Sequence, residues 1–324
     1  MDRIRVLQLG DICNVPWLLS RSLEKMGVQS TVVTFREHRF HNKFDVNLDV
    51  DRYPRVLQPA YRLKYLLKHM REYDVFHMHA ASFLPFYADA PLLKAAGKKI
   101  VYHFHGHDVY KRTFHREGYT VDKKGAGFLT KFADWKFVST PDMLDAVPDA
   151  QWLPNPVDAS EWKLAKPAVR KKRGSITVFH APTDRNKKGT DFVVEAVARL
   201  NKRGFDVRLD LVEGVSREEF RKRLIASDIV VDQLMGGWYG VLSLEALCAG
   251  KPTVVYVRED LVDFLPFNPF QLSGHKDIGE KLEELVVDGA LRRRLSAAGP
   301  KSVAKVHDPA VVARKVKKVY DEIT

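Results

Sequence analysis

Residues 228–257 read DIVVDQLMGGWYGVLSLEALCAGKPTVVYV. The stretch begins with an apolar run, Ile229–Gln233, which predicts a buried strand. A loop with three glycines follows, then an apolar segment, Val241–Ala249, of helical length, and a second apolar run, Thr253–Val257. Strand, helix and strand in this order predict a parallel βαβ unit whose sheet is covered on both faces.

The same alternation extends through the rest of the chain. Before the quoted stretch, Ser175–His180 predicts a strand and Asp191–Lys202 a helix; in the first half, Ile4–Leu9, Val75–His79 and Lys99–His105 predict strands. The sequence therefore predicts an α/β fold with two doubly wound parallel-sheet (Rossmann-like) domains facing each other across a cleft. In such sheets ligands bind at the carboxyl ends of the strands.

The alternation breaks at Leu153-Pro154-Asn155-Pro156 and in the basic stretch that follows. Prolines and a run of charges are typical of a domain junction. We expect a first domain over 1–160, a linker at about 160–172, and a second domain over 161–308. A basic amphipathic helix over 309–324 is expected to pack back towards the first domain.

Composition describes an ordinary globular protein with a basic surface. The 324 residues are 45% hydrophobic and 29% charged, and the net charge is +12. These values exclude a disordered or collagen-like chain, and the charge favours anionic partners. The two cysteines cannot form a disulfide framework, and MDRIRVLQLG leads directly into a predicted strand. Both features predict a cytoplasmic protein.

A basic loop follows the first strand of the second domain. It contains Arg185 and Lys188 and leads into the next helix, which Thr190 or Asp191 can cap. Cationic side chains beside a helix N-terminus favour phosphate, although an exposed basic loop explains the same residues. The glycine-rich loop leads through Gly240 and Val241 into another helix N-terminus, and a carboxylate, Glu245, lies one turn into that helix.

Together these segments resemble the donor-binding region of the retaining nucleotide-sugar glycosyltransferases of family 4, which have the GT-B fold. Lys188-Gly189 matches the segment that binds the diphosphate, with Arg185 beside it, and Glu245 matches the acid that holds the ribose. The resemblance implies transfer of a sugar from a nucleoside diphosphate sugar to an acceptor hydroxyl, with retention of configuration and without a metal or other cofactor. It also implies a glycan or a lipid-linked molecule as the acceptor.

Two positions depart from the family pattern. Gly237 stands where the family has an acid that contacts the donor sugar, and Pro182 stands where it has the phosphate-loop arginine. The departure at Gly237 leaves open an alternative in which the chain binds a nucleotide sugar but transfers it weakly or not at all.

The first domain contributes Gly10, His105 and Asp108. Gly10 ends the first strand and permits a tight loop at the cleft. His105-Gly106-x-Asp108 resembles a family segment whose histidine lies beside the transferred sugar. The resemblance therefore implies catalytic roles for His105 and Asp108 and a place for Gly10 near the donor.

Five histidines cluster in this domain, at positions 77, 79, 103, 105 and 107. Strand alternation places His103 and His105 on one face. Three interpretations compete: a metal site, which would imply a metal-dependent hydrolase; buried histidines satisfied by the backbone; and a catalytic position for His105.

Basic and apolar residues interleave over Arg52–Arg71, which predicts an amphipathic helix with a basic face. A basic loop is expected around Lys111 and Lys131, with Phe114 at least half exposed. Such a surface suits peripheral contact with an anionic membrane. Nucleic acid is not expected as a partner, because no sequence signature of a nucleic-acid-binding fold occurs.

Overall fold

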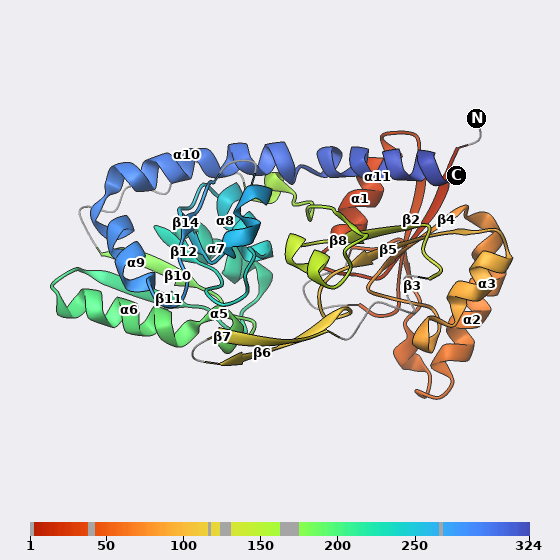
Figure 1. The fold of residues 1–324 in the computed structure, drawn as a ribbon, viewed down its shortest axis with the longest axis horizontal. Helices are drawn as coiled ribbons and strands as arrows, with labels where there is room; N and C mark the ends of the chain where they lie inside the picture. Colours follow the sequence, from red (N-terminus) through yellow and green to blue (C-terminus); the bar gives the residue numbers. More distant parts are fainter. Residues whose placement is uncertain (1–2, 38–42, 116–117, 124–130, 163–174, 266–267) are drawn as a thin grey trace. The chain divides into compact units, whose positions relative to one another are not determined.

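The computed structural model describes residues 3–37, 43–115, 118–123, 131–162, 175–265 and 268–324. The chain forms two compact units (Figure 1). Unit 1 comprises Met1–Lys111, Asp122–Pro156 and Pro309–Thr324, and unit 2 comprises Arg112–Val121 and Val157–Asp308. Most of the linker predicted at 160–172 lies outside the described residues.

Unit 1 is built on a parallel sheet in the order β3-β2-β1-β4-β5-β8-β9. Its strands are β1 (Arg5–Leu9), β2 (Gln29–Thr34), β3 (Val46–Asn47), β4 (Val75–His79), β5 (Lys99–Phe104), β8 (Trp135–Val138) and β9 (Gln151–Trp152). The order reverses at β1, from which successive strands are added first in one direction and then in the other. This reversal is the mark of a doubly wound sheet.

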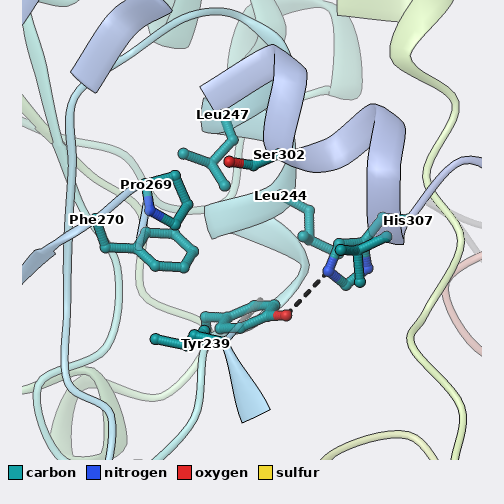
Figure 2. Close-up of a pocket in the computed structure, with 9 residues that line it drawn as sticks. Tyr239, Leu244, Leu247, Pro269, Phe270, Ser302 and His307 are labelled. Atoms are coloured by element: carbon teal, nitrogen blue, oxygen red, sulfur yellow. Dashed lines mark hydrogen bonds between the residues drawn. The ribbon is translucent and has the colours of Figure 1, made fainter. Parts of the chain in front are cut away.

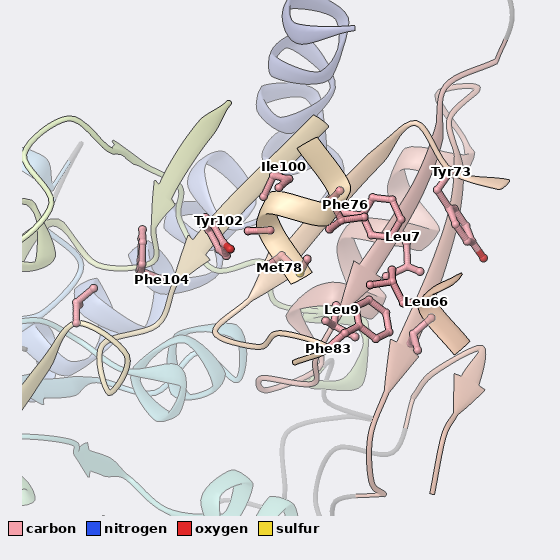
Figure 3. Packing of buried hydrophobic residues seen from close by; sticks show 14 of the residues in the cluster. Leu7, Leu9, Leu66, Tyr73, Phe76, Met78, Phe83, Ile100, Tyr102 and Phe104 are labelled. Carbon is pink, nitrogen blue, oxygen red and sulfur yellow. The ribbon is translucent and has the colours of Figure 1, made fainter. Parts of the chain in front are cut away.

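Side chains of these strands alternate between two hydrophobic cores. On one face, Phe76 and Met78 of β4 pack with Leu7 and Leu9 of β1, as Figure 3 shows. Helices α2 (Gln58–His69) and α3 (Asp89–Ala95) supply further residues to this core. On the other face, Val75 joins a core covered by α1 (Val15–Glu24) and α11 (Pro309–Ile323).

Helix α11 contributes a buried stripe to this second core. Val312, Ala313, Val316, Val319 and Tyr320 are its buried residues, and they recur at helical spacing. This stripe places the last segment of the chain in unit 1, against α1.

Two predicted local structures differ from those observed. The helix predicted over 52–71 is shorter, because Tyr53 takes the extended conformation that a following proline favours; α2 begins only at Gln58, between the 3₁₀ turns η1 (Val50–Arg52) and η2 (Met70–Glu72). The loop expected between Lys111 and Lys131 instead contains two paired strands, β6 (Tyr110–His115) and β7 (Gly118–Lys123). Burial alternates along β6, as in a strand with one covered face.

Unit 2 has a second parallel sheet, in the order β11-β10-β12-β13-β14. Its strands are β10 (Ile176–His180), β11 (Val207–Leu211), β12 (Ile229–Val231), β13 (Thr253–Val255) and β14 (Gln271–Leu272). Its helices are α5 (Arg185–Lys188), α6 (Thr190–Lys202), α7 (Arg217–Ala226), α8 (Val241–Cys248), α9 (Ile278–Val287) and α10 (Gly289–Val306), with the 3₁₀ turns η5 (Ala159–Trp162) and η6 (Glu259–Phe264). The predicted α/β class with two doubly wound sheets is confirmed.

Candidate functional site

The basic loop of unit 2 folds into the short helix α5. The carboxylate of Asp184 accepts a hydrogen bond from the N–H of Lys187 and caps α5, and Gly189, with a φ of 68°, separates α5 from α6. The predicted capping by Thr190 or Asp191 is therefore wrong. The Thr190 hydroxyl lies 3.0 Å from Nε2 of the buried His180 and is committed to that contact.

The ammonium of Lys188 points into the unit and forms an ion pair with Asp232, which directly follows β12. The Asp232 side chain is fully buried and that of Lys188 is 10% exposed. Burial raises the pKa of Asp232, but the charge and hydrogen bond of Lys188, together with bonds from Ser243 and Gly240, lower it by more. Asp232 is therefore ionised at neutral pH, and the pair consists of two opposite charges.

The same carboxylate accepts hydrogen bonds from the N-terminus of α8. The N–H groups of Gly240 and Ser243 each lie 3.2 Å from Oδ2 of Asp232, and the Ser243 hydroxyl lies 2.5 Å from it. Gly240 thus lies beside Lys188, but its N–H already has an anionic partner within the chain. Val241 is the first residue of the helix.

Glu245, on α8, is also paired. Its Oε1 lies 2.6 Å from the guanidinium of Arg217, which begins α7, and the Glu245 side chain is 8% exposed. The guanidinium of Arg217 stacks over the ring of Trp162 at 5.0 Å. Burial raises the pKa of Glu245, and Arg217 opposes that shift. Arg217 therefore holds this carboxylate in a fixed orientation.

Arg185 lies on the exposed side of the same loop. Its Nε donates to Glu213 at 3.0 Å, and the two side chains are 56% and 40% exposed. A cavity of about 230 Å³ lies beside it, lined by Asn186, Asp191 and Phe192 and, from the hairpin, Phe114 and His115. Exposure leaves Arg185 free to exchange Glu213 for a ligand.

Sequence reasoning located one member of each ion pair and missed the other. Arg185, Lys188 and Glu245 were predicted, whereas their partners Glu213, Asp232 and Arg217 were not. The formal charges of these three positive and three negative side chains therefore sum to zero. The sequence signal that could have revealed Asp232 is its position: a carboxylate directly after an apolar strand, where parallel sheets place ligand-binding groups.

The glycine-rich loop packs against another part of unit 2. Tyr239 is 6% exposed, and its hydroxyl lies 2.9 Å from Nε2 of His307. Figure 2 marks this contact with a dashed line. The pocket around this pair has a volume of about 20 Å³ and is lined mainly by apolar side chains such as Leu244, Leu247 and Phe270. That volume admits little more than one water molecule, so we assign no substrate to it.

In unit 1, the predicted catalytic residues form a compact turn after β5. The carboxylate of Asp108 accepts from the N–H groups of His105, at 3.1 Å, and Gly106, at 2.8 Å. Burial raises the pKa of Asp108, while these hydrogen bonds oppose the shift. Burial lowers the pKa of His105 to about 3, with a further contribution from His107. His105 is therefore neutral at neutral pH, and Asp108 shapes its backbone.

Gly10 lies close to the same cluster. Its φ is 108°, and a side chain there would place a Cβ 2.7 Å from the carbonyl oxygen of His79. Nδ1 of His79 lies 3.4 Å from Nε2 of His105, so His79 links the two predicted residues. Close packing and backbone conformation both require glycine at this strand end.

Three buried histidines of β4 and β5, His77, His79 and His103, offer ring nitrogens within 4.8 Å of one another. In the described part of the chain, neither nitrogen of His103 has a hydrogen-bond partner. The rings of His77 and His79 stack at 4.2 Å with an interplanar angle of 21°. In-plane lone pairs of nearly parallel rings do not converge on one ion, as zinc coordination requires. This geometry favours a packed histidine cluster over a metal-dependent hydrolase.

The cluster is tied to α11 by a polar chain. Nε2 of His79 lies 2.7 Å from Oε1 of Gln8, whose amide donates to the hydroxyl of Tyr320 at 3.2 Å; this hydroxyl lies 2.6 Å from Nδ1 of His77. Buried polar groups need such partners. The interpretation of buried histidines satisfied by the backbone is thus wrong for His77 and His79, which contact side chains.

This architecture is the GT-B fold of nucleotide-sugar enzymes. Residues 15–160 match the family model described as Glycosyltransferase Family 4, the family that the sequence resembles. No curated protein matches the sequence significantly.

Solved structures agree on the fold. The Anabaena protein HepE, in complex with UDP, is 12% identical, with a TM-score of 0.67 over 98% of this chain and 100% of that one. The catalytic domain of starch synthase IV from Arabidopsis thaliana, bound to ADP and acarbose, is 10% identical, with a TM-score of 0.69 over 99% of each chain. A UDP-N-acetylglucosamine 2-epimerase is 15% identical, with a TM-score of 0.58 over 98% of this chain and 95% of that one.

The family match and the fold together support the predicted class, a glycosyltransferase with a nucleotide-sugar-binding fold. Among the described residues, no helix combines the length and the apolar character needed to cross a membrane.

Proposed function

We propose that the protein transfers a sugar from a nucleoside diphosphate sugar to an acceptor hydroxyl, with retention of configuration and without a metal. One observation carries the proposal: the ammonium of Lys188 and the N-terminus of α8 meet at the carboxyl end of β12. In parallel sheets this edge binds ligands, and a cation beside a helix N-terminus favours phosphate. The solved structures of this fold with bound UDP and ADP support the same class of ligand.

The proposed chemistry follows from where charge develops. As the bond between sugar and phosphate breaks, negative charge grows on the departing diphosphate. Lys188 and the α8 N-terminus around Val241 would stabilise that charge from fixed positions. Arg185 would add its charge after exchanging Glu213 for the ligand. Glu245, oriented by Arg217, would accept hydrogen bonds from the ribose. His105, neutral at working pH, would lie beside the sugar and accept or donate a hydrogen bond.

Calorimetric titration with UDP, GDP, ADP and their sugar conjugates tests the proposal. We expect one nucleoside diphosphate to bind, with the same affinity in the presence of a chelator. Lys188→Met should abolish that binding, while Lys202→Met, which removes an exposed lysine of α6, should not. Failure of all three nucleotides to bind the wild-type protein would refute the proposal.

The second candidate is a GT-B protein that binds a nucleotide sugar with little or no transfer. Gly237 favours it, because a glycine offers no side chain to hold the donor sugar. Tight diphosphate binding without release of nucleotide from any conjugate, in the presence of glycan and lipid-linked acceptors, would select this candidate over the transferase.

We further propose that unit 1 contacts an anionic membrane that carries the acceptor. Val56, Leu57 and Leu67 are 82%, 52% and 50% exposed around α2. Basic residues surround them, namely Arg52, Arg55, Lys64, Lys68 and Arg71. Apolar side chains within a basic surface suit insertion between anionic lipid headgroups, with about 1 kcal/mol for each basic residue near the surface.

Flotation with vesicles tests this contact. The wild-type protein should float with phosphatidylglycerol vesicles at low salt and less at high salt, because salt screens exposed charges. Leu57→Ser combined with Leu67→Ser should reduce flotation. Val287→Ser, which also replaces an exposed apolar side chain but lies in unit 2, should not. Equal flotation with neutral phosphatidylcholine vesicles would contradict the proposed electrostatic contribution.

A further inference from the structure

Asp232 is the centre of the proposed donor site, although nothing in the sequence pattern singled it out. One oxygen of its carboxylate pairs with Lys188, and the other accepts from the N–H groups of Gly240 and Ser243 and from the Ser243 hydroxyl. This buried anion therefore neutralises a lysine and a helix N-terminus at once. Both of these groups would otherwise favour an external anion.

The packing around Gly240 shows how tightly the group is assembled. A Cβ at Gly240 would lie 3.3 Å from Oδ2 of Asp232 and 3.7 Å from Nζ of Lys188. The lysine, the aspartate and Gly240, which directly precedes α8, thus converge within van der Waals distance. The Lys188 side chain keeps a small exposed fraction, whereas the Asp232 side chain has none. We therefore expect a ligand to approach from the side of Lys188.

We propose that Asp232 is the positioning residue of the donor diphosphate site, where it fixes the ammonium of Lys188 against the N-terminus of α8. This inference rests on the proposed function. The ammonium has three N–H donors, and its bond to Asp232 uses one. The remaining donors are then available for a phosphate oxygen at a fixed place.

The charged and titratable groups that face the pair come from several elements. They are His180 of β10, whose pKa burial lowers to about 4; Lys187 of α5, whose pKa is lowered by burial, by Lys188 and by Arg112; and Glu245 of α8. The charge of Lys188 lowers the pKa of His180, and the charge of Asp232 raises it. Without the Asp232 carboxylate, the ammonium of Lys188 would have no fixed anion to oppose the charge of Lys187.

Asp232→Asn tests the role through two affinities, one for the nucleoside diphosphate and one for the same nucleoside without phosphates. The diphosphate affinity should fall by about tenfold or more, because the amide no longer pairs with the ammonium of Lys188. The nucleoside affinity should stay at the wild-type value, because the nucleoside carries no phosphate for Lys188 to bind.

Asp210→Asn is the matched control. It removes a carboxylate paired with Arg223 in the same unit, and both of its affinities should match those of the wild type. Asp232→Glu is a second test that does not depend on the asparagine variant folding. It keeps the charge but displaces the ammonium, so the diphosphate affinity should fall and the nucleoside affinity should not.

The outcomes separate the two proposals. Absence of nucleotide binding by the wild-type protein would refute the proposed function itself. Binding by the wild type together with an unchanged diphosphate affinity in folded Asp232→Asn or in Asp232→Glu would refute only the positioning role of Asp232. An equal loss of the diphosphate and nucleoside affinities in Asp232→Asn would refute it too, because the effect would then be general to the site.

Discussion

Acid should destabilise unit 1 through its histidine cluster. Burial is the largest cause that lowers the pKa values of His77, His79, His103 and His105, and neighbouring histidines add to the effect. In the unfolded chain the same side chains have ordinary pKa values near 6.5. Between that pH and the lower folded-state values, the unfolded chain binds more protons. The stabilisation is therefore present above about pH 6.5 and is lost as the pH falls.

The magnitude follows from proton linkage. A histidine that stays neutral in the folded state can bind a proton only in the unfolded chain. Protonation there stabilises the unfolded chain by about 0.2 kcal/mol at pH 7 and about 1.4 kcal/mol at pH 5.5. The cluster therefore loses roughly 5 kcal/mol over this interval, as much as the whole stability of a marginal domain.

Hydrogen exchange of the buried amides of β4 and β5 measures this loss within unit 1, together with urea unfolding at each pH. His103→Phe keeps an aromatic ring and removes one proton site, so the loss should shrink by about 1 kcal/mol. His69→Gln, on α2 outside the cluster, serves as the control. Stability that does not change between pH 7 and 5.5, or an acid loss unaltered by His103→Phe, would refute the reasoning.

Three further predictions concern packing, the polar chain and metal content. Gly299→Ala should lower the free energy of unfolding by about 1–3 kcal/mol, because its Cβ would lie 2.9 Å from the carbonyl oxygen of Leu247. Gly289→Ala is the control and should not lower it, because the nearest atoms there are the flexible ends of arginine side chains. Thermal unfolding checks both variants, and equal stability would contradict the clash. Tyr320→Phe should cost about 1–3 kcal/mol in urea unfolding by leaving His77 and Gln8 without their shared hydroxyl, unlike Tyr53→Phe at an exposed site. If Tyr320→Phe leaves the free energy of unfolding unchanged, these hydrogen bonds do not contribute to stability. Elemental analysis of the purified protein should find no stoichiometric zinc, and one zinc per chain would favour the metal-dependent hydrolase.

Element positions could be predicted from sequence because their signals are local. Val75–His79 was predicted as a strand and β4 has these bounds, and the helix predicted over Val241–Ala249 ends one residue earlier as α8. Apolar runs bounded by glycine or polar residues are sufficient for such predictions. The hairpin β6–β7 was missed because exposed polar residues alternate with half-buried ones along β6, a pattern that also suits an exposed loop.

The chemistry of the site depends on neighbours that no local pattern gives. Alternation correctly placed His103 and His105 on one face, but their contacts with His77 and His79 require the adjacency of β4 and β5. Likewise, Asp232 meets Lys188 only because β10 and β12 are neighbours in the sheet, which brings the loops after them together. Strand order is a tertiary property, so the ion-pair partners could not be read from spacing.

The pair of Lys188 and Asp232 offers a direct separation of stability from binding. Replacing a buried ion pair by apolar residues of similar size is often neutral or stabilising by about 1–4 kcal/mol, whereas removing one partner alone is strongly destabilising. Lys188→Met combined with Asp232→Leu should therefore unfold at or above the wild-type temperature yet lose nucleotide binding. Asp232→Leu alone should unfold well below it. A double variant that is destabilised but still binds nucleotide would show that the pair supports the fold and not the donor site.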